Sequence, residues 1–251
     1  MQNPSPAGSE VILEGPEEFA EEAKEELWSH EETTAAAAQQ AGAFDAELAP
    51  LPSKMVFVDK ETKEQSVHDV HLEKDEGNRP TTTLEGLNGL KPVFEGGVIT
   101  AGNASQLSDG ASASVVMDSK LAEQKGQDPL GAYRGMAVAG GEPDEMGIGP
   151  VKAVPKLLER FNLSMDDIGL WELNEAFAVQ VIYCRDELGI PNELLNVNGG
   201  AMALGHPLGA TGAKLMTTML HELERRKARY ALQAICEGGG TANATIIKRL
   251  D

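Results

Sequence analysis

The chain has 251 residues, enough to form one large domain or two smaller ones with a sizeable core. Its hydrophobic content of 41% and charged content of 24% are usual for a soluble globular protein. A formal net charge of −19 disfavours nonspecific binding to nucleic acid or to an anionic membrane, and no apolar stretch is long enough to span a bilayer. Two cysteines, Cys184 and Cys236, are too few for a disulfide framework, so we expect a cytoplasmic protein.

The N-terminal part of the chain changes character twice. Residues 1–17 are rich in Pro, Gly, Ser and Glu, which predicts a disordered acidic leader without the apolar run of a secretion signal. Residues 18–40 have helical composition, and Gly42 ends that helix. Irregular, turn-rich sequence follows with short β-like pieces, so residues 18–97 are predicted to be a helix plus a loop region.

Regular strand and helix patterns typical of an α/β protein begin at Val98. Residues 98–119 predict a strand, a Gly/Asn/Ser turn and then closely packed small residues, and YRGMAVAG predicts another strand. Pro150 suits the first turn of the amphipathic helix VKAVPKLLERFNL. Pro155 does not suit that helix, because it removes a backbone hydrogen bond at a cost of about 3 kcal/mol unless the helix kinks or starts late.

The last eighty or so residues alternate between strand and helix patterns. IGLWELNEAF predicts a strand leading into a helix that ends at Gly189. LLNVNGG predicts a strand before a glycine-rich turn, and a long helix should begin near Thr211. RYALQAICEGGGTANATIIKRL predicts a closing hairpin, so residues 98–251 are predicted to form one α/β domain.

Three polar residues stand in segments that favour chemistry. His206 lies in GGAMALGHPLGATG, where glycines let a ligand approach the backbone closely and the next helix points its N–H groups at the turn. Cys236 precedes three glycines, which suits an acid–base thiol beside an oxyanion hole, although a buried cysteine before a turn is the ordinary alternative. Asn174 follows a strand in WELNEAFA, a usual place for functional groups, and it could equally cap the next helix.

These segments together resemble the thiolase family of acyl-CoA acyltransferases, which make or cleave 3-ketoacyl-CoA. The resemblance rests on TAGNASQLSDGA, MGIGPV, NEAFAVQ, NVNGGAMALGHPLGATGAKL and CEGGG, which follow one another in the family's order. SHEETTAAAAQQAGAFDAELAPL and DEGNRPTTTLEGLNGLKPVF resemble the family's loop region. The resemblance implies a thiolase-like α/β fold that comprises the C-terminal half and part of the loop domain, with the N-terminal half absent.

The resemblance also implies roles for individual residues. His206 resembles the histidine that activates a nucleophilic cysteine, and Cys236 the acid–base cysteine that exchanges a proton with the acetyl-CoA α-carbon. Asn174 resembles the asparagine of the first oxyanion hole, and the backbone N–H of Gly238 would serve the second. The pantetheine arm of CoA is expected to lie along Ala104, Ser105, Leu107, Ala176 and Phe177. The resemblance implies coenzyme A as a substrate, no permanently bound cofactor and no metal.

The nucleophile is the part that the resemblance does not supply. In the family a cysteine of the N-terminal half takes the acyl group, and Cys184 lacks the Gly/Ser-rich turn that such a residue needs. We therefore expect part of a longer 3-ketoacyl-CoA or acetoacetyl-CoA thiolase. The alternatives are a CoA-ester-binding half of a split enzyme, and a complete enzyme that uses Cys184. A homo-oligomer, or a partner supplying the N-terminal half, is implied in either of the first two cases.

Overall fold

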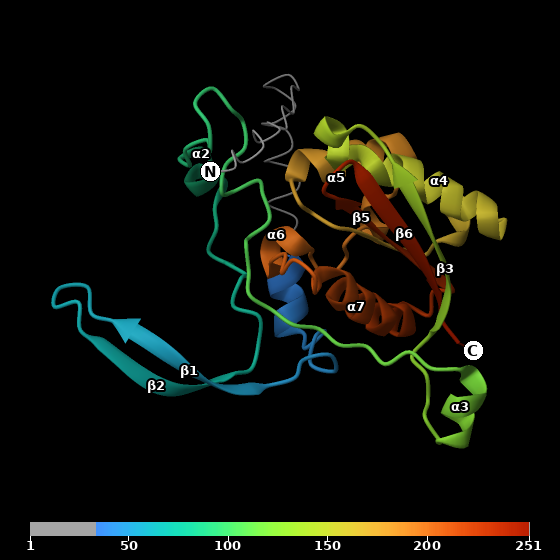
Figure 1. Cartoon of the computed structure of the whole chain (residues 1–251), viewed down its shortest axis with the longest axis horizontal. Coiled ribbons are helices and arrows are strands. Elements are labelled where there is room, and N and C mark those ends of the chain that lie inside the picture. Colours follow the sequence, from blue (N-terminus) through green and yellow to red (C-terminus); the bar gives the residue numbers. More distant parts are fainter. Residues whose placement is uncertain (1–33, 251) are drawn as a thin grey trace, which may run out of the picture.

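The protein is built around one mixed four-stranded sheet in the order β3-β6-β5-β4 (Figure 1). Its strands are β3 (Ala132–Gly140), β4 (Leu170–Leu173), β5 (Tyr230–Glu237) and β6 (Thr241–Lys248). The strands β3, β6 and β5 pair antiparallel, whereas β4 pairs parallel with β5. The computed structural model describes residues 34–250, so the predicted leader and most of the predicted 18–40 helix lie outside the described residues.

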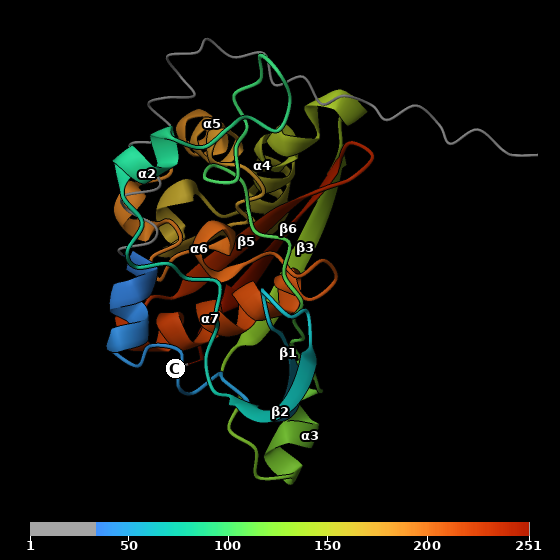
Figure 2. The same cartoon turned by 90° about the vertical axis from the view of Figure 1, so that its left-hand side faces the viewer.

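Helices cover both faces of this sheet, which makes the α/β class evident in the described chain. Figure 2 shows α4 (Gly149–Phe161) and α5 (Ala178–Leu188) on one side of the strands and α7 (Thr211–Arg226) on the other. The side chains of β5 alternate accordingly, since Leu232 packs with the α4 and α5 residues and Ala231 with those of α7. The strands β4 and β5 are buried between these helices, which leaves the strand ends as the place for functional groups.

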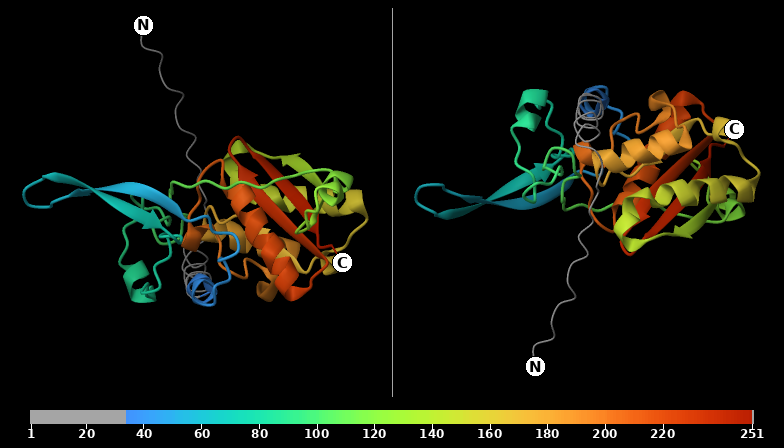
Figure 3. Two further views of the ribbon diagram at one scale, coloured as in Figure 1. Left: turned by 90° about the horizontal axis from the view of Figure 1, so that it is seen from below. Right: turned by 90° about the horizontal axis from the view of Figure 1, so that it is seen from above.

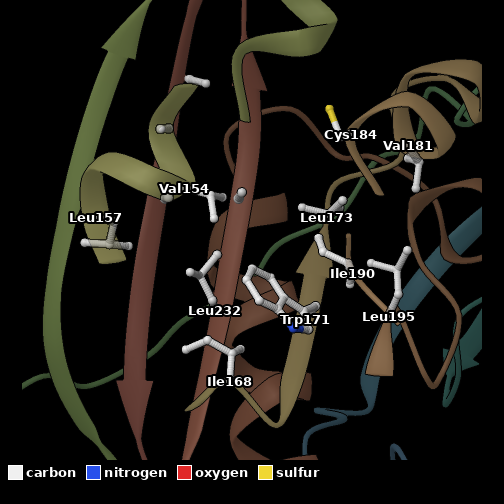
Figure 4. Close-up of a cluster of buried hydrophobic side chains, with 14 of the residues drawn as sticks. Val154, Leu157, Ile168, Trp171, Leu173, Val181, Cys184, Ile190, Leu195 and Leu232 are labelled. Carbon is white, nitrogen blue, oxygen red and sulfur yellow. The ribbon is translucent and has the colours of Figure 1, made fainter. Parts of the chain in front are cut away.

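The apolar residues of α4 pack against those of β4 and β5 in a buried core (Figure 4). Trp171, Leu157 and Leu232 are fully buried and pack together there. The helix α4 runs from Gly149 through Pro155 to Phe161, so it does not start late to avoid Pro155. Burial of the apolar face of α4 against the sheet outweighs the one backbone hydrogen bond that proline cannot make.

Several other predicted elements are confirmed, with small shifts at their ends. The helix α5 ends at Gly189 in the left-handed region, α7 begins at Thr211, and β5 and β6 form the antiparallel closing hairpin. The connections carry short helices at α2 (Leu84–Asn88), α3 (Ser119–Gln124), α6 (Ala201–Leu204), η1 (Pro143–Ile148), η2 (Met165–Asp167) and η3 (Asn192–Leu194).

The irregular stretch before the sheet contains more order than its sequence predicts. An antiparallel hairpin, β1 (Leu51–Val58) with β2 (Gln65–Leu72), projects away from the sheet (Figure 1). Residues 34–40 are helical and pack through Ala35, together with Phe44, against α6. One of the short β-like pieces that the sequence predicts, KMVFVD, overlaps β1. Its pairing with β2 was missed because both faces of the hairpin are mostly exposed, so it lacks the apolar–polar alternation that marks a half-buried strand.

Three predicted features near the sheet are wrong. No strand forms at Val98, because the Asn103 side chain accepts from the Thr100 backbone and turns the chain. Residues 107–118 are not closely packed but extend alongside α7, with Ser114 Oγ 3.3 Å from Thr217 Oγ1 (Figure 3). LLNVNGG makes one bridge to β4 and no strand, since Asn196 adopts a left-handed φ of 43°.

Candidate active site

Asn174 and Cys236 lie at the carboxyl ends of the neighbouring parallel strands β4 and β5. Asn174 follows the last residue of β4, and its backbone N–H donates to the Ala234 carbonyl at 3.0 Å. Cys236 lies two residues beyond Ala234 on β5 and pairs with Ala242 of β6. Both side chains are buried. The sheet register therefore brings together two residues that are far apart in the sequence, as expected for a site at strand ends.

Asn174 is not a helix cap, because the N-cap of α5 is Phe177. Its Nδ2 lies 3.3 Å from Nε2 of His206, and its buried Oδ1 has no partner among the described residues. A buried amide oxygen without a partner costs free energy, which makes it a feature of functional interest.

His206 is held on three sides in the turn between α6 and α7. Its backbone N–H donates to the Gln106 carbonyl at 3.0 Å, and its Nδ1 lies 2.6 Å from Thr211 Oγ1. Nε2 faces Asn174. Burial, and then the charge of Lys214, lower the pKa of the half-buried imidazole. A neutral imidazole at neutral pH is available as a base.

The corner after Asn174 is tied to the histidine turn by a buried carboxylate. Glu175 accepts from the backbone N–H of Met202 at 2.9 Å and from the side chain of Asn196. A Cβ added at Gly200 would lie 2.2 Å from the Glu175 carboxyl carbon, so only glycine fits there. This contact fixes the NEAF segment and the glycine-rich turn relative to each other.

The segment predicted to hold the CoA arm lies between these two elements. Ser105 N–H donates to the Ala176 carbonyl at 3.0 Å, and Ala104 forms a bridge with Phe177. These four predicted residues are therefore neighbours on two adjacent, partly exposed segments. Leu107 lies just beyond them and is 91% exposed, so the structure leaves it at the margin of the site.

Cys236 carries a thiol that is protonated at neutral pH. Burial raises its pKa to about 11, and the neighbouring Glu237 carboxylate adds to that shift. Gly238 lies in the exposed turn between β5 and β6, and a side chain there would meet open space. A protonated thiol beside an open glycine turn can donate a proton to a ligand that reaches it.

Cys184 is placed differently, inside the core on α5 (Figure 4). Its thiol donates to the Gly147 carbonyl at 3.6 Å and lies 3.8 Å from Gln180 Nε2. Burial raises the pKa of this thiol to about 12. So little thiolate forms at neutral pH that Cys184 is unsuited to nucleophilic attack.

Comparison with known proteins identifies the family of this chain. The thiolase C-terminal domain family matches residues 127–249, and the thiolase N-terminal domain family matches residues 17–120. The chain belongs to the thiolase family. This thiolase chain includes part of the N-terminal domain, which corrects the expectation that the whole N-terminal half is absent; the domain boundary expected at residue 98 stays a prediction.

Two curated relatives and one solved structure show how much of a thiolase the chain spans. It is 48% identical over 220 residues to "3-ketoacyl-CoA thiolase 2, peroxisomal" of Arabidopsis thaliana, covering 86% of this chain and 47% of that protein. It is 44% identical to the Bacillus subtilis (strain 168) 3-ketoacyl-CoA thiolase, covering 88% of this chain and 56% of that protein. Human mitochondrial 3-ketoacyl-CoA thiolase in complex with CoA superposes with a TM-score of 0.79 at 34% identity, covering 93% of this chain and 57% of that chain. The chain thus spans about half the length of these relatives.

The sequence did not single out all the residues that build this candidate site. Thr211 and Gln106 contact His206 directly, and Lys214 Nζ donates to the carbonyls of Leu204 and Gly205 at 3.1 and 2.9 Å. A hydroxyl five residues after the histidine, at the start of a helix, is the only signal that could have marked Thr211. Gln106 contacts His206 through its backbone carbonyl, and a backbone contact of this kind cannot be predicted from the residue type.

Two properties concern the described residues as a whole. Between residues 34 and 250, no helix is both long and apolar enough to cross a membrane. Within the same range, no three His, Cys, Asp or Glu side chains are grouped so that they could hold a metal ion.

Gly205 is a glycine that the site requires, and replacing it gives a testable prediction. Its φ is +87°, and an added Cβ would lie 2.2 Å from Ser108 Oγ. We expect Gly205→Ala to lower the free energy of unfolding by about 1–3 kcal/mol and to displace His206 from Asn174. Urea denaturation measures the loss, and Gly209→Ala is the control because it shares a positive φ but meets nothing within 4 Å. Equal losses in the two variants would contradict the packing argument.

Glu47 gives the stability of the protein a predicted pH dependence. Its carboxylate accepts from Thr218 Oγ1 of α7 at 2.8 Å, while Oε2 is buried without a partner among the described residues. Burial raises the pKa of Glu47 from 4.5 to about 7. Between these values the unfolded chain loses a proton that the folded chain keeps, so the contribution of Glu47 to stability is greatest below pH 4.5 and falls as pH rises toward 7.

The variant Glu47→Gln should remove this part of the pH dependence. We expect it to be more stable than the wild type by about 1–2 kcal/mol at pH 8, a value reduced for solvent screening, and equal to it near pH 4.5. Urea midpoints measured across this pH range test the expectation, with the exposed Glu61→Gln as control. An unchanged pH profile in Glu47→Gln would show that its carboxyl ionises normally.

Proposed function

We propose that this chain carries the acid–base half of a thiolase active site, for CoA-dependent cleavage or formation of 3-ketoacyl-CoA. The observation that supports it most directly is the contact between Asn174 and His206 at the strand ends where Cys236 also lies. A neutral imidazole, a protonated thiol and an amide at the end of neighbouring strands are the groups that acyl transfer to carbon needs. Family membership and the CoA complex of the human mitochondrial relative support the same reaction.

In the proposed cleavage reaction His206 takes the proton from a nucleophilic cysteine thiol, and the thiolate attacks C3 of the 3-ketoacyl-CoA. The C2–C3 bond then breaks, and the electron pair goes to the enolate of acetyl-CoA. Cys236 donates its proton to the α-carbon of that enolate, while the Gly238 N–H contributes to the oxyanion hole. The Cys236 thiolate then takes the proton of an incoming coenzyme A thiol, and the CoA thiolate attacks the acyl-enzyme thioester, whose oxygen is stabilised through Asn174. The bond from the acyl carbon to the sulfur of the nucleophilic cysteine breaks, the acyl group leaves as acyl-CoA, and His206 returns its proton to that sulfur.

The proposed nucleophile is supplied by the part of a thiolase that this chain does not span. Cys184 is buried with its pKa raised to about 12, which argues against its taking that role. The raised pKa of Cys236 supports cleavage, because the neutral thiol is the form that donates a proton. We propose β-oxidation or related acyl-CoA metabolism as the setting; the cytoplasmic location and a homo-oligomer remain predictions.

The CoA ester is proposed to bind along the two adjacent segments that contain Ala104, Ser105, Ala176 and Phe177. Their small side chains and partly exposed backbone leave room for a thin, extended arm. Leu107, which is fully outside the packed core, would contact only the outer part of the arm.

Thiolysis of a 3-ketoacyl-CoA by free CoA tests the proposal. It is measured with the 251-residue chain alone and with the same chain plus a polypeptide that carries the remaining length of a thiolase, here called the reconstituted thiolase. We expect turnover only in the reconstituted thiolase. Turnover by the chain alone that disappears in Cys184→Ala would contradict the proposal and establish Cys184 as the nucleophile.

A second candidate function is a CoA-ester-binding half of a split thiolase, inactive without a partner chain. Exposed apolar side chains favour it, because Val115 and Val116 are more than 80% exposed and Tyr133 and Val138 lie exposed on the edge strand β3. Copurification with a thiolase-like chain would support this function. A monomer that stays soluble and binds no CoA would contradict it.

A further inference from the structure

The hydroxyl of Thr211 occupies a position from which it can control the proton of His206. Thr211 is buried at the first residue of α7, and its Oγ1 lies 2.6 Å from His206 Nδ1. The same oxygen lies 2.9 Å from the Pro207 carbonyl, to which the hydroxyl donates. The thiolase reaction as proposed above uses His206 but assigns no part to Thr211.

With the Thr211 hydroxyl donating to the Pro207 carbonyl, the donors and acceptors around the ring form a consistent arrangement. A threonine hydroxyl has one proton, and in this structure it donates that proton to the Pro207 carbonyl at 2.9 Å. Oγ1 then accepts, and the proton between it and His206 belongs to Nδ1. In a neutral ring Nε2 is left unprotonated, and it accepts from the Nδ2 of Asn174 at 3.3 Å.

We propose that Thr211 is a positioning residue that fixes neutral His206 in the Nδ1–H tautomer. The lone pair of Nε2 then faces Asn174 and the strand ends, where a base is needed. The inference rests on the proposed function for its catalytic consequence, whereas the tautomer itself is a property of this chain without substrate.

Lys214, about one turn after Thr211 on α7, holds the other side of the same turn. Its Nζ donates to the carbonyls of Leu204 and Gly205, which precede His206 in the chain. The first turn of α7 thus fixes both the backbone that carries the imidazole and the edge of the ring that carries its proton. Lys214 fixes the position of the imidazole ring, and Thr211 determines which ring nitrogen is unprotonated.

The tautomer is measured by ¹⁵N NMR of histidine-labelled protein, with a His206→Gln spectrum to assign the resonances. In the wild-type chain, at a pH where His206 is neutral, Nε2 should show the shift of an unprotonated nitrogen and Nδ1 that of a protonated one. We expect Thr211→Val, which keeps the shape and removes the hydroxyl, to change the tautomer ratio by about tenfold, the equivalent of one hydrogen bond. Thr211→Ser keeps the hydroxyl and should restore the wild-type ratio.

Either of two results would overturn the proposal. A wild-type spectrum with the proton on Nε2 contradicts it even if Thr211→Val fails to fold. An unchanged Nδ1–H tautomer in a folded Thr211→Val chain contradicts it as well. Because no substrate is present, these outcomes are independent of whether the reconstituted thiolase turns over 3-ketoacyl-CoA.

In the reconstituted thiolase the same variants give a kinetic readout. Thr211→Val should lower kcat while leaving KM within about twofold, because the tautomer affects proton transfer and not CoA binding. Thr211→Ser should recover most of the lost kcat. Loss of kcat in Thr211→Val without a change in tautomer would show that Thr211 acts on the site in another way.

Discussion

Replacing His206 by alanine is expected to lower kcat for thiolysis by the reconstituted thiolase by about 10²–10⁴-fold, with KM little changed. The reason is that Nε2 of His206 is the base aimed at the strand ends through its contact with Asn174. Cys236→Ala should cause a loss of similar size, because the enolate then has no proton donor beside it.

The matched control for His206→Ala is His221→Ala. His221 lies in the third turn of α7, the helix that follows the turn containing His206. It is about 15 Å along the helix from Thr211. Its replacement should leave thiolysis within about twofold of wild type. Equal losses in the two histidine variants, or unchanged thiolysis in His206→Ala, would contradict the role assigned to His206.

Replacing Trp171 by alanine is expected to lower the free energy of unfolding by about 3–5 kcal/mol, enough to unfold a marginal domain. Trp171 is 0% exposed and packs in the core between α4 and the sheet (Figure 4). Its position on β4 is three residues before Asn174, so the cavity also loosens the strand that positions the site.

Urea denaturation of two control variants separates packing from other effects of the Trp171 change. Trp171→Phe should lose clearly less than Trp171→Ala, because the ring is largely kept and the indole N–H has no hydrogen-bond partner among the described residues to lose. Leu208→Ala removes an apolar side chain that is 76% exposed and should change stability by less than about 0.5 kcal/mol. Similar losses in Trp171→Phe and Trp171→Ala would show that cavity formation is not the cause.

Local sequence patterns predicted the elements that are buried on one side or capped by glycine. The amphipathic stripe of α4, the glycine at the end of α5 and the apolar runs of β5 and β6 each have a local physical cause, and each was found. The expected strand at Val98 failed because a side chain, Asn103, took the hydrogen bond of a backbone group. In the exposed hairpin, the β-like piece KMVFVD was predicted, but its pairing with β2 was not, because backbone pairing and not burial holds these two strands together.

In the candidate site, too, local sequence patterns predicted individual residues, whereas contacts between distant segments could not be predicted. The sequence predicted roles for Asn174, His206 and Cys236 because each stands at a strand end or in a glycine-rich turn. Their proximity depends on the sheet register, which pairs β4 with β5, and on the contact between His206 and Gln106. No sequence spacing encodes these long-range contacts, so the part of Thr211 became visible only in three dimensions.

Exchange of the α-protons of acetyl-CoA with D₂O in the reconstituted thiolase tests the central claim most directly. It isolates proton transfer between Cys236 and carbon from acyl transfer to the nucleophile. We predict that wild type and Cys184→Ala incorporate deuterium at similar rates and that Cys236→Ala incorporates almost none. Exchange that survives in Cys236→Ala, or that is lost in Cys184→Ala while the fold is kept, would contradict the assignment of the acid–base site.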